Sequence, residues 1–143
     1  MKHLDANVLI AWHRQDHPHH HEVRKWCERM LATDEPFGAI DLVWVAVLRV
    51  CSNPRVFPVP SPVATLFDFR SSIEVQSTHI AVSPGSRHWE IVERLCRQHH
   101  ISGNLVNDAY IASAAIEHGA DLVSVDGDFG RFRELRWIDP RVA

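Results

Sequence analysis

Four aspartates are the residues of this sequence whose type and placement could do chemistry. Asp5 follows a short apolar segment near the N-terminus, Asp108 lies in a stretch with helical spacing, and Asp126 and Asp128 follow a second apolar segment. Two carboxylates about 4 Å apart repel each other by about 4 kcal/mol at an effective dielectric constant of about 20, so a fold tolerates a cluster of them where a cation binds. Oxygen ligands favour Mg²⁺ or Mn²⁺, and such an ion activates water and neutralises phosphate charge. The predicted chemistry is therefore hydrolysis of a phosphate ester.

Each of these aspartates also has a purely structural explanation. Asp5 could cap a helix, and Asp108 could be an early-turn carboxylate that the helix dipole favours. Asp126 and Asp128, with Gly127 between them, could form a solvated turn. The hypothesis of a metal site therefore depends on whether the fold brings the four carboxylates to one rim.

The segment from Asn104 to Phe132 predicts how three of them are positioned. A helix over about 105–118 places Asp108 at the N-terminal edge of an apolar face. Gly119 ends that helix, because a residue without Cβ adopts the left-handed conformation at little cost. The apolar strand that follows, over 122–125, delivers Asp126 and Asp128 to its carboxyl end. Ligands bind at this end of the strands in open parallel sheets.

The N-terminus predicts the same arrangement for the fourth carboxylate. A strand from Lys2 ends at Asp5, and Asp5 or Asn7 is able to cap the helix that follows. Further helices are predicted over about 22–32, 42–52, 62–73 and 87–99, strands within 35–40 and 78–82, and a final edge strand at 137–138. The alternation of strands and helices predicts an α/β fold with a parallel sheet.

Length and composition fit one domain over residues 1–143, in which 45% of residues are apolar and 23% are charged. The net charge of −3 excludes a strongly basic surface but leaves room for a local basic patch. No apolar run reaches the roughly 18 residues that a membrane span needs, so the expected location is the cytoplasm, with no membrane partner. Three widely spaced cysteines, Cys27, Cys51 and Cys96, predict buried thiols in a reducing compartment.

Basic side chains follow the acidic loop, where Arg131 and Arg133 alternate with Phe132 and precede Trp137. This pattern suits the grip of a phosphate backbone beside the metal, with an aromatic ring stacked on a base. A solvated face next to an apolar edge would show the same pattern.

Arg49 and Arg55 are further candidates for binding RNA. His17 and His21 could hold a transition metal if both lay on one helix, but Pro18 interrupts the segment and no cysteine lies near. A solvated loop is the favoured interpretation of the histidine run.

Four segments of the sequence form a recognisable pattern. They are LDANVLIA (4–11), LRVCSNPRVF (48–57), NLVNDAYIASAAIEHGA (104–120) and LVSVDGDFGRF (122–132). In order and spacing they resemble PIN-domain ribonucleases, and in particular the VapC toxins of type II toxin–antitoxin modules. The resemblance covers nearly the whole chain.

The resemblance implies a three-layer α/β/α sandwich with a mainly parallel central sheet. It also implies RNA cleavage that depends on Mg²⁺ or Mn²⁺, a homodimer, and inhibition by a VapB antitoxin whose C-terminal tail enters the active site. Matched by motif, Asp5, Asp108 and Asp126 are the expected metal ligands, and Asp128 is a further acid of the same site. Asn7 and Ser124 occupy small polar positions expected to hold the carboxylates or water molecules in place.

One departure from the family pattern concerns the second acid of the site. Most relatives carry a glutamate about three residues before the arginine that matches Arg49, and this sequence has Ala46 there. The nearest acid is Asp41, which is therefore the fifth candidate catalytic residue, although it could instead cap the helix that begins there. If Asp41 does not serve, one ligand is missing, and the alternative function is a weakened PIN module that binds antitoxin or RNA without efficient cleavage.

Overall fold

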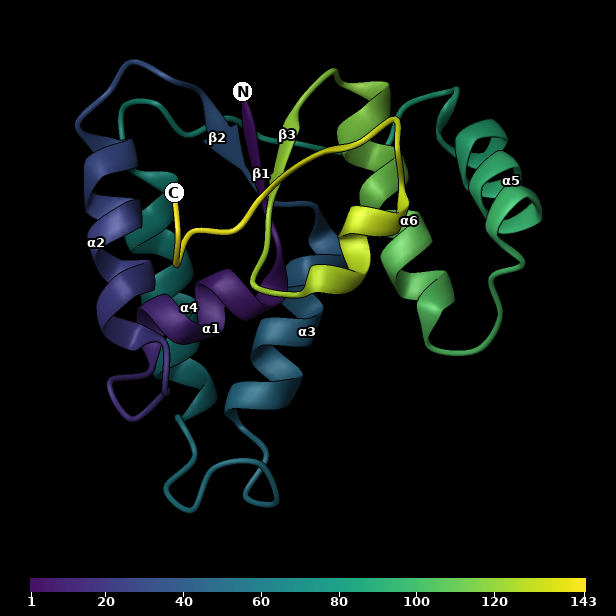
Figure 1. Cartoon of the computed structure of the whole chain (residues 1–143). Coiled ribbons are helices and arrows are strands. Elements are labelled where there is room, and N and C mark those ends of the chain that lie inside the picture. Colours follow the sequence, from purple (N-terminus) through teal and green to yellow (C-terminus); the bar gives the residue numbers. More distant parts are fainter.

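The computed structural model covers residues 1–143, and four strands, six α-helices and one 3₁₀ helix make up the fold (Figure 1). The strands are β1 (Lys2–Leu4), β2 (Phe37–Gly38), β3 (Asp121–Val123) and β4 (Arg136–Ile138). The helices are α1 (Ala6–His13), α2 (His20–Leu31), α3 (Asp41–Cys51), α4 (Val63–Glu74), α5 (His88–His99), α6 (Leu105–Glu117) and the 3₁₀ helix η1 (Gly127–Arg131).

All four strands are parallel and lie in the order β2-β1-β3-β4, which confirms the predicted α/β fold with a parallel sheet. The chain's first strand therefore lies beside a strand more than a hundred residues away, and Leu4 is level with Val123. The carboxyl ends of β1 and β3 are neighbours. Asp5 and Ser124, the residues directly after these strands, consequently lie side by side.

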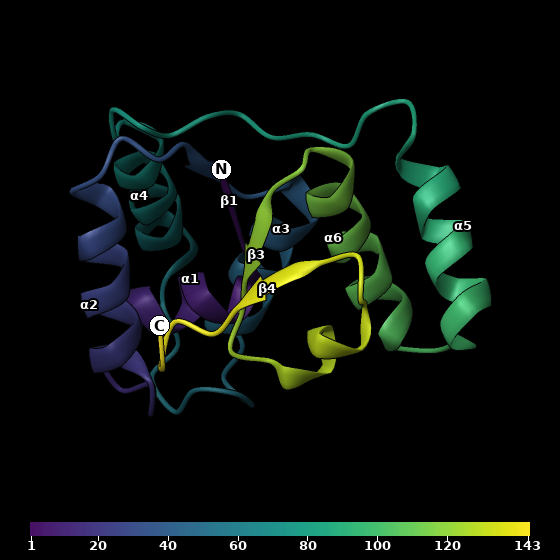
Figure 2. The same cartoon turned by 45° about the horizontal axis from the view of Figure 1, so that its top comes forward.

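The side chains of each strand alternate between two apolar cores. Leu4 and Val123 lie in one core, with residues of α1, α2, α3 and α4, whereas Leu122 lies in the other, with residues of α5, α6 and η1. Figure 2 shows α2 and α4 on one side of the sheet and α5 and α6 on the other. The layers are helix, sheet and helix, as the α/β/α expectation required.

The predicted strand at Thr78–Val82 is wrong. This segment runs beside β2, where Phe37 accepts a hydrogen bond from the Ile80 amide at 2.9 Å and donates one to the Thr78 carbonyl at 3.1 Å. Only one bridge forms, between Phe37 and His79. The pairing stops there because β2 has only two residues before Ile40 caps the next helix.

No helix of the structure is both long enough and apolar enough to cross a membrane. All three cysteines are free, and Cys27 and Cys51 are buried. Burial raises the pKa of Cys51 to about 11, so this thiol stays protonated at neutral pH.

His3 on β1 predicts a dependence of stability on pH. Its ring is buried, and the centroid of this ring lies 5.4 Å from that of the His118 ring. The Nε2 atom of His3 has no hydrogen-bond partner. Burial lowers the pKa of His3 from 6.5 to about 4, helped by the charges of His118 and the N-terminus. Because the unfolded chain binds the proton more tightly, the stability from a neutral His3 is fully present above pH 6.5 and is lost as pH falls towards 4. The expected loss is up to about 3 kcal/mol.

Urea unfolding at pH 7, 5.5 and 4.5 measures this loss. His3→Leu is expected to flatten the change relative to the native chain, whereas the exposed His21→Leu is expected to leave it unchanged. An unaltered pH dependence in His3→Leu would rule out His3 as its source.

Candidate metal centre

The site lies at the carboxyl ends of β1 and β3, where three separate segments meet. Asp5 links β1 directly to α1, and its Oδ1 accepts a hydrogen bond from the Ala6 amide at 2.7 Å, so it caps that helix. Asp108 lies in the first turn of α6. Asp126 caps η1 through a 2.9 Å hydrogen bond from the Asp128 amide to its Oδ1. The structural roles considered for Asp5 and Asp126 are therefore real, and they fix where the carboxylates lie.

A buried polar network surrounds Asp5. Its side chain is nearly inaccessible to solvent, and its Oδ2 accepts hydrogen bonds from Ser124 Oγ at 2.8 Å and from Asn7 Nδ2 at 3.1 Å. Neither oxygen of Asp5 is in a salt bridge. Three donors therefore orient this carboxylate while leaving its negative charge uncompensated by any basic side chain.

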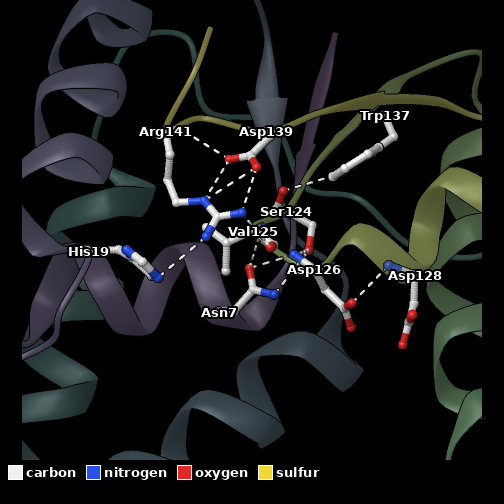
Figure 3. Close-up of polar contacts among 9 residues, drawn as sticks. All are labelled: Asn7, His19, Ser124, Val125, Asp126, Asp128, Trp137, Asp139 and Arg141. Atoms are coloured by element: carbon white, nitrogen blue, oxygen red, sulfur yellow. Dashed lines mark hydrogen bonds and ion pairs between the residues drawn. The ribbon is translucent and has the colours of Figure 1, made fainter.

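Asn7 and Ser124 also fix the backbone that leads to Asp126 (Figure 3). Asn7 Oδ1 accepts a hydrogen bond from the Val125 amide at 3.1 Å, and Ser124 Oγ accepts one from the Asp126 amide at 3.0 Å. The Asn7 side chain thus takes the place that the next strand residue would have in the sheet. This explains why β3 ends at Val123 rather than at Val125, where the sequence predicted its end.

Asp108, Asp126 and Asp128 form the group whose geometry fits a metal ion. Each offers one carboxylate oxygen, and these three atoms lie within 4.8 Å of one another. An all-oxygen donor set of three carboxylates, two half-buried and one exposed, suits a hard divalent cation such as Mg²⁺ or Mn²⁺. Asp5 is not one of these three, although the resemblance predicted it as a ligand.

The electrostatics of the site connect Asp5 to this group. Burial, together with the negative charges of Asp126, Asp5 and Asp128, raises the pKa of Asp108 to about 6, against a lowering by Arg131. Burial also raises the pKa of Asp5, against its hydrogen bonds from Ser124 and Ala6. The four aspartates therefore share one region of negative potential, which a cation would neutralise.

Asp41 lies outside this group. It is exposed in the first turn of α3 and lines a hollow of about 320 Å³ together with Trp44, Arg70 and Glu74. The cap of α3 is Ile40, so Asp41 does not fill the capping role considered for it either. Ala46, at the position of the family's glutamate, is half-buried in the middle of the same helix.

The four candidate arginines differ in their relation to the site. Arg131 is adjacent to it, since its Nε donates to the Asp128 carbonyl at 3.0 Å and its Nη2 lies 3.5 Å from Asp128 Oδ1. Arg133, Arg49 and Arg55 are exposed, and none of them is in a salt bridge with the site. Phe132 is buried in the core with α5 and α6, so it cannot stack on a base.

Sequence reasoning missed the contacts that Trp137 and Arg141 make beside the site. Trp137 Nε1 donates to the Ser124 carbonyl at 2.9 Å, and Arg141 Nη2 donates to the Val125 carbonyl at 3.1 Å. Neither contact has a short-range signal, because the partners lie 13 and 16 residues apart in sequence. The parallel pairing of β3 with β4, which places Val123 level with Ile138, is the signal that could have revealed them.

The histidine run forms no metal site. His20 Nδ1 contacts the Ala11 carbonyl at 2.8 Å, and the ring of His17 lies 5.7 Å from that of His19. The only group of side chains placed to hold an ion is the aspartate group. His17 and His19 lie in the loop before α2, as expected, whereas His20 and His21 belong to the first turn of α2, where a loop was expected.

Comparisons with known proteins point to one family. The PIN domain family profile matches residues 2–135. Ribonuclease VapC25 of Mycobacterium tuberculosis is 44% identical over 139 residues, 97% of this chain and 98% of that protein. Ribonuclease VapC31 of the same species is 45% identical over 137 residues, 96% of each chain. A toxin–antitoxin complex from Klebsiella pneumoniae shares the fold, with a TM-score of 0.64, 16% identity and 98% of each chain covered.

Proposed function

Since the chain belongs to the PIN-domain family of VapC ribonucleases, toxins of type II toxin–antitoxin modules, we propose that its aspartates form a Mg²⁺- or Mn²⁺-dependent active site for hydrolysis of RNA phosphodiester bonds. The observation that supports this proposal most strongly is the meeting of three carboxylate oxygens within 4.8 Å, with the pKa of Asp108 raised to about 6. Uncompensated negative charge of this kind is stable where a divalent cation binds.

The roles of the residues follow from their positions. The ion would be held by Asp108, Asp126 and Asp128. Asp5 would contribute a fourth negative charge, or would itself bind the ion, as the resemblance predicts. When bound, the ion would activate a water molecule and neutralise the charge that develops on the phosphate. Asp128, the exposed member of the group, would also orient the attacking water. Asn7 and Ser124 would keep Asp5 and the 124–126 backbone in register.

The proposed partners are RNA and a VapB-type antitoxin. Arg131 beside Asp128 would contact an RNA phosphate next to the scissile one, with Arg133, Arg49 and Arg55 as further contacts. The antitoxin would neutralise the toxin by occupying the same site. A homodimer, a cytoplasmic location and one PIN domain over residues 1–143 are part of the proposal.

A second candidate function is a PIN module with weak or no cleavage. It is favoured by Ala46 at the family's glutamate position and by Asp41, which lies outside the aspartate group and lines a hollow with Trp44 and Arg70. Such a protein would bind antitoxin or RNA with little turnover.

Incubation of the purified protein with total RNA distinguishes the two functions. A metal-dependent ribonuclease is expected to cleave RNA with Mg²⁺ or Mn²⁺ and to stop when EDTA is added, because three carboxylates alone cannot neutralise the phosphate. Cleavage that continues in EDTA would contradict the proposed metal site. RNA or antitoxin binding without cleavage at saturating Mn²⁺ would favour the second function.

A further inference from the structure

The loop that bears Asp126 and Asp128 is held from the C-terminal side by two side chains of a segment beyond the family match. The profile ends at residue 135, whereas the contacts come from Trp137 on β4 and from Arg141 after it. Figure 3 shows both side chains directed at the backbone of Ser124 and Val125, on the side opposite Asn7.

Trp137 contacts the loop in two ways, through its ring and through its one hydrogen-bond donor, Nε1. Its Nε1 donates to the Ser124 carbonyl at 2.9 Å. A Cβ added to Gly130 would lie 3.5 Å from the ring, and one added to Gly127 would lie 3.9 Å away. The indole therefore covers the backbone at both ends of the loop helix η1, which begins directly after Asp126.

Arg141 fixes the next carbonyl. Its Nη2 donates to the Val125 carbonyl at 3.1 Å, while Asp139 accepts hydrogen bonds from Nη2 at 2.6 Å and from Nε at 3.0 Å. A guanidinium held at two positions by one carboxylate has little freedom to rotate. Its Nη1 also lies 3.4 Å from His19 Nε2, in the segment before α2.

We propose that Trp137 and Arg141 are positioning residues for the metal-binding loop, an inference that rests on the proposed function. Together with Asn7 and Ser124 they hold the backbone of residues 124–126 from two sides. A shift of this backbone would carry the carboxylate of Asp126 away from those of Asp108 and Asp128. Outer contacts of this kind commonly change metal affinity about 10- to 100-fold when they are removed.

The test measures binding of Mn²⁺ to the full chain by isothermal titration calorimetry, beside RNA cleavage as a function of Mn²⁺ concentration. Trp137→Phe removes the donor and keeps an aromatic ring over the glycines, and Arg141→Ala removes the guanidinium. Each is expected to weaken Mn²⁺ binding about tenfold, with cleavage recovering at high Mn²⁺. Arg141→Lys, which keeps one charged donor, is expected to recover part of the affinity.

Arg136→Ala is the matched control. This arginine also donates to a backbone carbonyl, that of Gly119, and pairs with Asp121, but it lies at the opposite end of the same strand from the site. Its removal is expected to leave Mn²⁺ affinity within twofold of the native value. Circular dichroism melts of every variant report whether the fold is kept.

The possible outcomes separate this inference from the proposed function. If the native chain binds no Mn²⁺ and cleaves no RNA, the proposed function fails. If the native chain binds Mn²⁺ and both folded variants bind it within twofold of the native affinity, the positioning role is wrong and the proposed function stands. Equal weakening by Arg136→Ala would likewise overturn the positioning role, because it would show a general effect on the sheet.

Discussion

Replacing Asp108 by asparagine is expected to lower RNA cleavage at least about 10³-fold, about 4 kcal/mol in transition-state stabilisation. The reason is that Asp108 supplies one of the three donor oxygens that lie within 4.8 Å. The same change is expected to stabilise the metal-free protein at pH 7, because burial and three neighbouring aspartates all disfavour its negative charge. A substitution that lowers activity and raises stability is expected at a site where the carboxylates that bind the metal repel one another in its absence.

The pH dependence supplies an internal check on Asp108. Its pKa in the folded chain is raised from 3.8 to about 6, so the folded state binds the proton more tightly than the unfolded state. The stability that comes from a protonated Asp108 is fully present below pH 3.8 and is lost as pH rises through 6. The melting temperature of Asp108→Asn minus that of the native chain should therefore increase between pH 4 and pH 7 in EDTA. A difference that is constant with pH, together with native cleavage rates, would remove Asp108 from the site.

Replacing Asp5 by asparagine is expected to reduce cleavage by a similar factor of at least about 10³, for the loss of one negative charge beside the ion. Asparagine caps a helix about as well as aspartate, so the side-chain oxygen of residue 5 still accepts the hydrogen bond from the Ala6 amide. The asparagine Nδ2, however, cannot accept the hydrogen bonds that Asp5 Oδ2 accepts from Ser124 and Asn7, so the free energy of unfolding should fall by about 1 to 3 kcal/mol. The two substitutions differ in stability because Asp5 accepts three hydrogen bonds, whereas Asp108 accepts none.

Ser124→Ala provides a graded comparison for Asp5. It removes one donor to Asp5 and the acceptor of the Asp126 amide while keeping every carboxylate, so a loss of about 10- to 100-fold in cleavage is expected. The rates are measured with total RNA at saturating Mn²⁺. If Asp5→Asn cleaves RNA as fast as the native chain, the buried carboxylate has only its structural role as a cap.

The parts of the site that local sequence could predict are those set by neighbouring residues. Asp5 directly follows β1, Asp126 comes three residues after the end of β3, and Asp108 lies one turn into a helix whose end Gly119 marks, so each position is decided within about ten residues. Parallel strand ends then meet at one edge of a sheet by geometry alone. The α/β fold was predictable for the same reason.

The parts that local sequence could not predict depend on register between distant segments. Thr78–Val82 has the apolar pattern of a strand, but how far it pairs is set by the short length of β2. Asp41 has the right charge, yet it lines a hollow between α3 and α4 together with Arg70, away from the aspartate group. Trp137 was assigned to an edge strand and to a possible base contact, while its actual partners, Ser124 and two glycines, follow from the pairing of β3 with β4.

The hydrogen bond from Ser124 to Asp5 joins residues 119 positions apart. A growing polypeptide on the ribosome therefore has no such contact, and no complete set of carboxylates, until almost the whole chain has been translated. A chain that stops before Asp126 lacks two of the three carboxylates of the proposed metal site. The connectivity of the fold thus delays assembly of the proposed site until synthesis of the chain is nearly finished.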